Sequence, residues 1–224
     1  MMHENLKTEA LLDLTATQAK PLFEQFEYPW EVLPALKGFI RTLGQGLSRE
    51  EYEEVSPEVW IARSATVAPT AFIAGPTIIG PDTEVRHCAF IRGSALIGSG
   101  CVVGNSTEIK NSILFDGVQV PHYNYVGDSV LGRRAHMGAG SITSNIKADK
   151  KNIVVRGDGT GAETGLRKFG AVLGDGADVG CNTVLNPGSV VGRGTNIYPL
   201  SFVRGYIPAR SIYKHSGEIA EKRP

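Results

Sequence analysis

Apolar residues recur at every sixth position through most of the chain. One run extends over residues 55–115 and another over residues 173–203, and between them the step breaks near Pro121 and resumes one register later at Tyr125. A helix would place apolar residues three and four apart, and a half-buried strand would place them two apart. The six-residue step therefore predicts short strands joined by tight corners. Glycine often occupies the corner after the apolar position, as at Gly80, Gly98, Gly104, Gly132, Gly138, Gly174, Gly180 and Gly192.

Three short strands per turn would close a triangular coil of about 18 residues, and stacked coils would pair as parallel strands about 4.8 Å apart. Each coil would bury its apolar positions against the coils above and below it. The pattern resembles that of the hexapeptide-repeat proteins, and this resemblance implies a left-handed parallel β-helix. We therefore expect an all-β fold, a left-handed parallel β-helix with an N-terminal helical cap.

The ends of the chain depart from the repeat. Residues 1–54 are expected to form a helical N-terminal extension that includes a capping box at residues 48–51, followed by a short helix. The β-helix is expected over residues 55–215, with an inserted loop at about 146–170 whose glycine-rich part favours a flexible lid or an inter-subunit flap. Residues 216–224 are expected to form a mobile polar tail.

Composition and charge exclude several classes of protein. The chain has 224 residues and a formal net charge of zero, which argues against a general nucleic-acid or membrane-surface binder. No apolar run approaches the length of about 18 residues that spans a bilayer, and the N-terminus lacks the pattern of a secretory signal. The three cysteines form no CxxC pair, which favours a reducing compartment. We expect a cytoplasmic protein.

Charged residues occupy corner positions that the repeat would normally fill with small residues. Arg92 and Lys110 are one coil apart, so their side chains are expected to stack. Two cations about 5 Å apart repel by roughly 1 kcal/mol in water, so they should either splay into solvent or enclose an anion such as a phosphate. Glu108 shares a strand face with Lys110. His122 begins an irregular segment where the register breaks, and a histidine near a carboxylate can act as a general base.

The stretch from Arg92 to Asn145 resembles the acetyltransferase half of the bacterial bifunctional N-acetylglucosamine-1-phosphate uridyltransferase/glucosamine-1-phosphate acetyltransferase. The shared segments are EIK at 108–110, PHYNYVGD at 121–128, MGAGSITSN at 137–145, RKFGAVLGD at 167–175 and VGCNT at 179–183. The resemblance covers roughly residues 85–205. It implies a homotrimer whose sites form between neighbouring β-helices, with coenzyme A in the groove between coils.

The resemblance implies a role for each matching residue. His122 would be the general base that takes a proton from the sugar amine, Glu108 would support it, and Asn145 would contact the reacting acetyl group and could stabilise the oxyanion. The residues implied in substrate binding are Arg92, Lys110, Tyr125, His136 and Lys168, with Lys151 as the alternative to Lys168. The residues implied in acetyl-CoA binding are Ala139, Asn145 and Cys181. No metal and no bound cofactor are expected, since acetyl-CoA is a co-substrate.

Three features depart from the family. His136 stands where the family has an asparagine that touches the sugar, and Cys181 stands where it has a serine that touches coenzyme A. Residues 1–54 are too short for a nucleotide-binding α/β domain, and the 224 residues contain no LxxGxGTRM loop. We therefore expect this chain to lack uridylyltransferase activity.

The favoured function is an acetyl-CoA-dependent N-acetyltransferase that acts on an amino-sugar phosphate or a nucleotide-activated amino sugar. One alternative is a non-catalytic sugar-phosphate-binding or regulatory β-helix protein. A less favoured alternative is a metal-dependent hydratase of the γ-carbonic-anhydrase type, built on His87, His122 and His136. That family places two of its three histidine ligands close together in sequence, whereas these three histidines are widely spaced.

Overall fold

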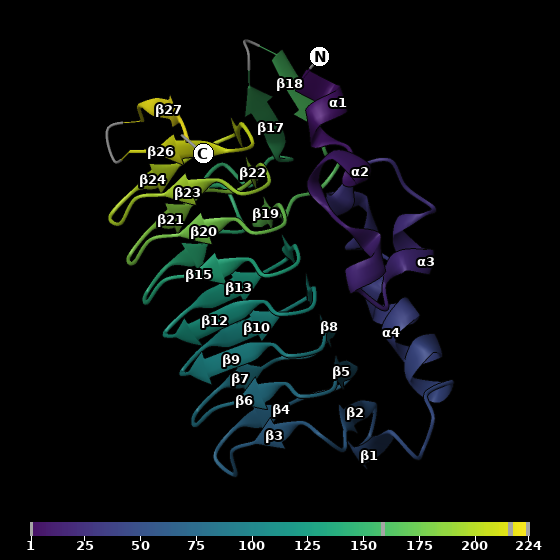
Figure 1. Cartoon of the computed structure of the whole chain (residues 1–224). Helices are drawn as coiled ribbons and strands as arrows, with labels where there is room; N and C mark the ends of the chain where they lie inside the picture. Colours follow the sequence, from purple (N-terminus) through teal and green to yellow (C-terminus); the bar gives the residue numbers. More distant parts are fainter. Residues whose placement is uncertain (1, 158–159, 215–216, 223–224) are drawn as a thin grey trace.

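The computed structural model describes residues 2–157, 160–214 and 217–222. The chain winds into a β-helix whose three faces are sheets, here called A, B and C, with helices along one side (Figure 1). Sheet A contains β1 (Tyr52–Ser56), β2 (Val59–Ala62), β5 (Thr77–Ile79), β8 (Ala95–Ile97), β11 (Ser112–Leu114), β14 (Val130–Leu131), β19 (Ala171–Leu173), β22 (Ser189–Val191) and β25 (Tyr206–Ile207). Sheet B contains β3 (Thr66–Val67), β6 (Glu84–Val85), β9 (Val102–Asn105), β12 (Gln119–His122), β15 (His136–Met137), β20 (Asp178–Val179), β23 (Asn196–Ile197), β26 (Ser211–Tyr213) and β27 (Ile219–Glu221). Sheet C contains β4 (Phe72–Ile73), β7 (Phe90–Ile91), β10 (Glu108–Lys110), β13 (Tyr125–Gly127), β16 (Ile142–Thr143), β21 (Val184–Leu185) and β24 (Phe202–Val203).

The six-residue repeat produces this architecture directly. Strands of successive coils pair in parallel, so Ile79 lies beside Ile97 in sheet A and Ile91 lies beside Ile109 in sheet C. These branched side chains are fully buried and stack along the inside of the β-helix. The fold class expected from the sequence, a left-handed parallel β-helix, is confirmed.

The register shifts earlier than the sequence pattern indicated. Ile97 pairs with Leu114 rather than with Phe115, and Ile109 pairs with Val126 rather than with Tyr125. Two steps are therefore shortened to five residues, one from Ile109 to Leu114 and one from Val126 to Leu131, and neither lies at Pro121. Phe115 is buried in another way, because its ring packs edge-on against Phe23 of an N-terminal helix at a centroid distance of 5.5 Å. Tyr125 points to the outer side of sheet C because its neighbour Val126 is the buried residue.

Short helices cover the outer side of sheet A rather than the open end of the coil stack (Figure 1). They are α1 (Met2–Leu6), α2 (Thr8–Leu11), η1 (Leu14–Ala16), α3 (Lys20–Phe23), η2 (Pro29–Val32) and α4 (Leu36–Gln45). Backbone hydrogen bonds attach this layer to the β-helix, from Asp116 N–H to the Ala16 carbonyl at 3.0 Å and from Asp175 N–H to the Leu11 carbonyl at 3.0 Å. As a result, even the outward side chains of sheet A, such as Ile78, Leu96 and Ile113, are buried.

The expected short helix after residues 48–51 is absent from the described chain. The segment makes a single turn, in which Tyr52 N–H donates to the Ser48 carbonyl at 2.9 Å, and then enters β1. β1 pairs antiparallel with β2 at the first edge of sheet A, so this segment gains its hydrogen bonds from a sheet. Val55 lies in β1 and is 54% exposed, so it does not belong to the row of inward residues.

The insertion contains regular secondary structure. Two strands, β17 (Val154–Gly157) and β18 (Thr160–Glu163), form an antiparallel hairpin, and residues 158–159 lie outside the described chain. Ile153, Val155 and Phe169 are fully buried. The lid or inter-subunit flap expected over 157–170 stays a prediction: Ala162 and Phe169 of this segment are buried, and most of its other described residues are exposed or half-buried.

The C-terminal segment also contains a strand that the sequence did not predict. β27 pairs antiparallel with β26 at the last edge of sheet B, which covers that edge. Residues 215–216 and 223–224 of the expected boundary and tail lie outside the described chain. Among the described residues, no helix has the length and apolar character needed to cross a membrane.

Candidate functional site

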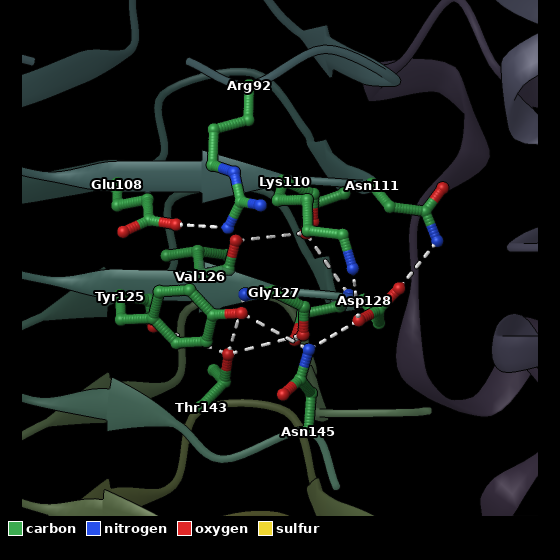
Figure 2. Close-up of polar contacts among 12 residues, drawn as sticks. Arg92, Glu108, Lys110, Asn111, Tyr125, Val126, Gly127, Asp128, Thr143 and Asn145 are labelled. Carbon is green, nitrogen blue, oxygen red and sulfur yellow. Dashed lines mark hydrogen bonds and ion pairs between the residues drawn. The ribbon is translucent and has the colours of Figure 1, made fainter. Parts of the chain in front are cut away.

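A polar network fills the corner where sheet C turns toward sheet A (Figure 2). Asp128 follows β13 and is only 4% exposed. Its Oδ2 accepts hydrogen bonds from Lys110 Nζ at 3.3 Å and from Asn145 Nδ2, and its Oδ1 accepts one from Asn111 Nδ2 at 2.8 Å. Asn145 Nδ2 also donates to the Tyr125 hydroxyl at 3.2 Å. The structure therefore brings Lys110, Tyr125 and Asn145 together, as the resemblance implied.

Arg92 and Lys110 stack at one corner, in agreement with the sequence. The backbone N–H of Arg92 donates at 2.8 Å to the carbonyl of Ile109, the residue before Lys110. Arg92 and Lys110 therefore occupy the same position in successive coils. Splayed side chains or a bound anion were the two expected ways to relieve the repulsion between these cations. The structure shows a third way, because each cation has its own carboxylate: Glu108 Oε1 lies 2.7 Å from Arg92 Nη1, and Asp128 pairs with Lys110.

His122 lies at the other edge of sheet C, where β12 turns out of sheet B. His122, Ala139 and Cys181 lie in one column, one residue from each of three successive coils. Backbone hydrogen bonds connect them: the N–H of Gly140, which follows Ala139, donates to the His122 carbonyl at 3.0 Å, and the N–H of Asn182, which follows Cys181, donates to the Ala139 carbonyl at 2.8 Å. The base candidate and the two acetyl-CoA candidates are thus adjacent along the axis of the β-helix. His122 is exposed.

The expected contact between Glu108 and His122 is absent. The Glu108 carboxylate bonds to Arg92 instead, and the His122 ring has no hydrogen-bond partner within the described chain. The physical reason is that Glu108 and Arg92 are outward neighbours on adjacent strands of sheet C, where opposite charges attract at short range. Support for His122 by Glu108 would require this ion pair to open.

The expected role of Asn145 as an oxyanion donor also conflicts with the structure. Both N–H groups of its amide are already used, one by Asp128 and one by Tyr125. The free group is the carbonyl oxygen Oδ1, which is an acceptor. Burial raises the pKa of Tyr125, and the nearby charges of Asp128 and Glu108 raise it further, so the Tyr125 hydroxyl stays protonated near neutral pH.

His136 does not join this face within one chain. It lies in sheet B, where its Nδ1 is 2.8 Å from Asp178 Oδ1, and Asn196 donates to the other oxygen of Asp178 at 3.2 Å. His87 Nδ1 instead bonds the Thr70 hydroxyl at 2.8 Å. His87, His122 and His136 therefore do not converge, and no group of three or more potential metal ligands occurs among the described residues.

The geometry of the insertion bears on the two candidate lysines. Phe169 N–H donates to the Asn145 carbonyl at 3.0 Å, so Lys168 is the residue next to one that contacts Asn145. The backbone N–H of Lys151 donates to Asp149 Oδ1 at 3.0 Å. Both lysines are exposed, and Lys168 is the one whose chain neighbour touches the network.

Asp128 and Asn111 are site residues that the six-residue pattern did not indicate. Asp128 ends the PHYNYVGD segment, and in the observed register it lies one coil after Asn111 and next to Gly127, the residue paired with Lys110. An acidic residue at this corner, close to Lys110, was the signal in the sequence.

The comparisons with known proteins match this segment. Residues 73–167 match the family model described as the GMPPB C-terminal domain, a range that contains the whole network. The bifunctional protein GlmU of Methanococcus maripaludis is 32% identical over 213 residues, which cover 94% of this chain and 52% of the relative. GlmU of Methanococcus vannielii is 34% identical over 160 residues, which cover 71% and 34% of the two chains.

The homologues of this chain are bifunctional GlmU proteins. The resemblance stated from the sequence is thereby confirmed. A bifunctional sugar-1-phosphate nucleotidylyltransferase/acetyltransferase of Sulfurisphaera tokodaii is also similar, at 34% identity over 107 residues, which cover 48% of this chain and 27% of the relative. The chain thus spans between 27% and 52% of the length of these GlmU-type relatives.

Two solved structures show similarity at low identity. A mutant of the perosamine N-acetyltransferase of Caulobacter crescentus, in complex with CoA and GDP-perosamine, gives a TM-score of 0.37 at 16% identity, over 72% of this chain and 56% of that one. A mutant of the N-acyltransferase AntD of Bacillus cereus, in complex with dTDP and coenzyme A, gives a TM-score of 0.38 at 17% identity, over 74% and 82%.

Proposed function

We propose that the chain is an acetyl-CoA-dependent N-acetyltransferase that acts on an amino-sugar phosphate or a nucleotide-activated amino sugar. The observation that carries this proposal is the grouping around sheet C: Arg92 and Lys110 lie at one edge, and His122 lies at the other. The strands of sheet C are three residues long at this level, so the cations and the histidine lie at the two ends of the same short strands. The homology to GlmU-type proteins supports the same chemistry.

The proposed reaction is a direct transfer. The nitrogen of the sugar amine attacks the thioester carbon of acetyl-CoA, and the carbonyl electron pair moves onto oxygen. His122 takes a proton from the nitrogen as the new C–N bond forms. The C–S bond then breaks, and the protonated His122 returns the proton to the departing thiolate of coenzyme A.

The cations would hold the phosphate of the acceptor. An incoming phosphate would compete with Glu108 for Arg92, since charge-assisted bonds to phosphate are strong. Release of Glu108 from Arg92 would free its carboxylate to orient His122. The proposal therefore includes a change of partner for Glu108 when the sugar phosphate binds.

A thiol-release assay with a panel of amino sugars and their phosphates tests this function. We expect coenzyme A release to depend on an acceptor that carries both an amine and a phosphate. Binding of sugar phosphate without thiol release would favour the alternative of a non-catalytic module, which the pairing of Glu108 with Arg92 in place of His122 supports. Release of pyrophosphate from UTP would contradict the proposed lack of uridylyltransferase activity, which rests on the missing LxxGxGTRM loop.

Coenzyme A is proposed to lie along the column of Ala139 and Cys181, and cysteine labelling offers a test within one molecule. Burial raises the pKa of the Cys101 thiol to about 12, so this thiol should not react with a thiol reagent in the folded protein. Cys88 and Cys181 are exposed and should react. We expect coenzyme A to slow labelling of Cys181 at least about tenfold and to leave Cys88 unchanged. Equal labelling of Cys181 with and without coenzyme A would contradict this placement.

We also propose that the chain forms a homotrimer through sheet C. The outer side of this sheet carries the neighbouring Phe72 and Phe90, which are 60% and 41% exposed, and at its other end Phe202, which is 52% exposed. The N-terminal helices cover sheet A and leave this face open. Light scattering should give a mass close to three times the chain mass of 24.0 kDa, and Phe90→Glu should reduce it, because a charge would enter an apolar contact. A monomeric wild type would contradict the proposal.

A further inference from the structure

Asp128 is a buried carboxylate that contacts two proposed site residues at once. It is held in the left-handed backbone region with φ of 49°, at the corner after β13. Lys110 and Asn145 reach it from the coils on either side, and Asn111 contacts its other oxygen (Figure 2). A carboxylate at this depth requires partners, because an unpaired buried charge is costly.

The carboxylate also fixes which end of the Asn145 amide faces the solvent. An ionised carboxylate can only accept hydrogen bonds, so the atom of Asn145 that faces Asp128 must be the nitrogen. The second N–H of that nitrogen goes to the Tyr125 hydroxyl at 3.2 Å. Asn145 Oδ1 is therefore the atom that remains for a ligand.

We propose that Asp128 is a positioning residue for acetyl transfer: it holds the Lys110 ammonium at the phosphate site and fixes Asn145 so that its acceptor oxygen Oδ1, rather than its amide nitrogen, faces the bound sugar phosphate. This inference rests on the proposed function.

Asp128→Asn is the direct test, because it keeps the size of the side chain and removes the charge. Asn145 then loses its fixed orientation, and kcat should fall by about 10- to 100-fold. The KM for the sugar phosphate should rise less than about threefold, because the loss of a neighbouring negative charge offsets the looser position of Lys110. Lys110→Gln should instead raise KM. An unchanged kcat in folded Asp128→Asn would overturn the proposal.

Asn111→Gly is the matched control. Asn111 contacts the same carboxylate, and its φ of 46° suits glycine, so the corner should persist. We expect kcat within about threefold of wild type, because Lys110 and Asn145 keep their partner. If Asn111→Gly lowers kcat as much as Asp128→Asn, the effect belongs to corner stability, and the positioning role is overturned.

A measurement that needs no turnover separates this inference from the proposed function. The side-chain amide protons of Asn145, assigned in NMR spectra by their loss in Asn145→Ala, should exchange slowly with water in the wild type and in Asn111→Gly. In Asp128→Asn they should exchange at least about tenfold faster. Slow exchange in folded Asp128→Asn would overturn the positioning role. A wild type that acetylates no acceptor would refute the proposed function, and the exchange rates would still decide the role of Asp128.

Discussion

Replacement of His122 by alanine should lower kcat for acetyl transfer by about 100- to 10,000-fold, the range typical of a lost general base. His122 is exposed, and its ring makes no hydrogen bond within the described chain, so its removal costs the fold little. The thermal midpoint and the KM for acetyl-CoA should therefore stay near their wild-type values. Steady-state thiol release and a melting curve on the same preparation measure both effects.

His87→Ala provides the matched control for this prediction. His87 lies in the same corner column as His122, and Asn105 lies between them. The N–H of Ser106, which follows Asn105, donates to the His87 carbonyl at 3.3 Å. Because it lies away from Tyr125 and Asn145, its removal should leave kcat within about twofold. Equal losses in both variants, or none in His122→Ala, would exclude His122 as the base.

Trp30→Ala should lower the free energy of unfolding by about 3–5 kcal/mol, as large-to-small changes at buried aromatic residues do. Trp30 is 1% exposed, stacks on Tyr28 at a centroid distance of 4.9 Å and lies 5.6 Å from the ring of Phe169. The substitution would leave a cavity between the N-terminal helices and the end of the insertion. Denaturant unfolding followed by fluorescence or circular dichroism measures the change.

Val55→Ala serves as the comparison for stability. Val55 is the first apolar position of the six-residue pattern in the sequence, but in the structure it is exposed in β1. Its truncation should therefore change the free energy of unfolding by less than about 0.5 kcal/mol. A loss for Trp30→Ala no larger than that for Val55→Ala would contradict the packing of the N-terminal helices on sheet A. Because Phe169 donates to the Asn145 carbonyl, Trp30→Ala should also reduce acetyl transfer.

The β-helix was predictable because each coil repeats the same physical requirement. An inward branched residue and a small corner residue recur on every side, so the signal accumulates over many coils, as it does at Ile79, Ile97 and Val103. The stacking of Arg92 on Lys110 followed from the same repeat. The resemblance to GlmU-type proteins also pointed to Tyr125 and Asn145, which the structure joins by a hydrogen bond.

Other features depend on contacts that a sequence pattern does not specify. The shortened step from Ile109 to Leu114 leaves Phe115 outside the inward row, and its ring is buried against Phe23, a partner distant in the sequence. Glu108 pairs with Arg92 rather than with His122, because Arg92 is the near neighbour on the adjacent coil. The hairpin at β17 and β18 and the final strand β27 gain hydrogen bonds from long-range or local pairing that the six-residue repeat does not encode.

The proposed function requires one sugar phosphate to span sheet C from Lys110 to His122, and a crystal structure with glucosamine 1-phosphate and coenzyme A would show whether it does. We expect the phosphate within hydrogen-bond distance of Arg92 and Lys110, the amine beside His122, and Glu108 turned away from Arg92. A sugar phosphate bound elsewhere, with the Arg92–Glu108 pair intact and His122 facing no ligand, would contradict it.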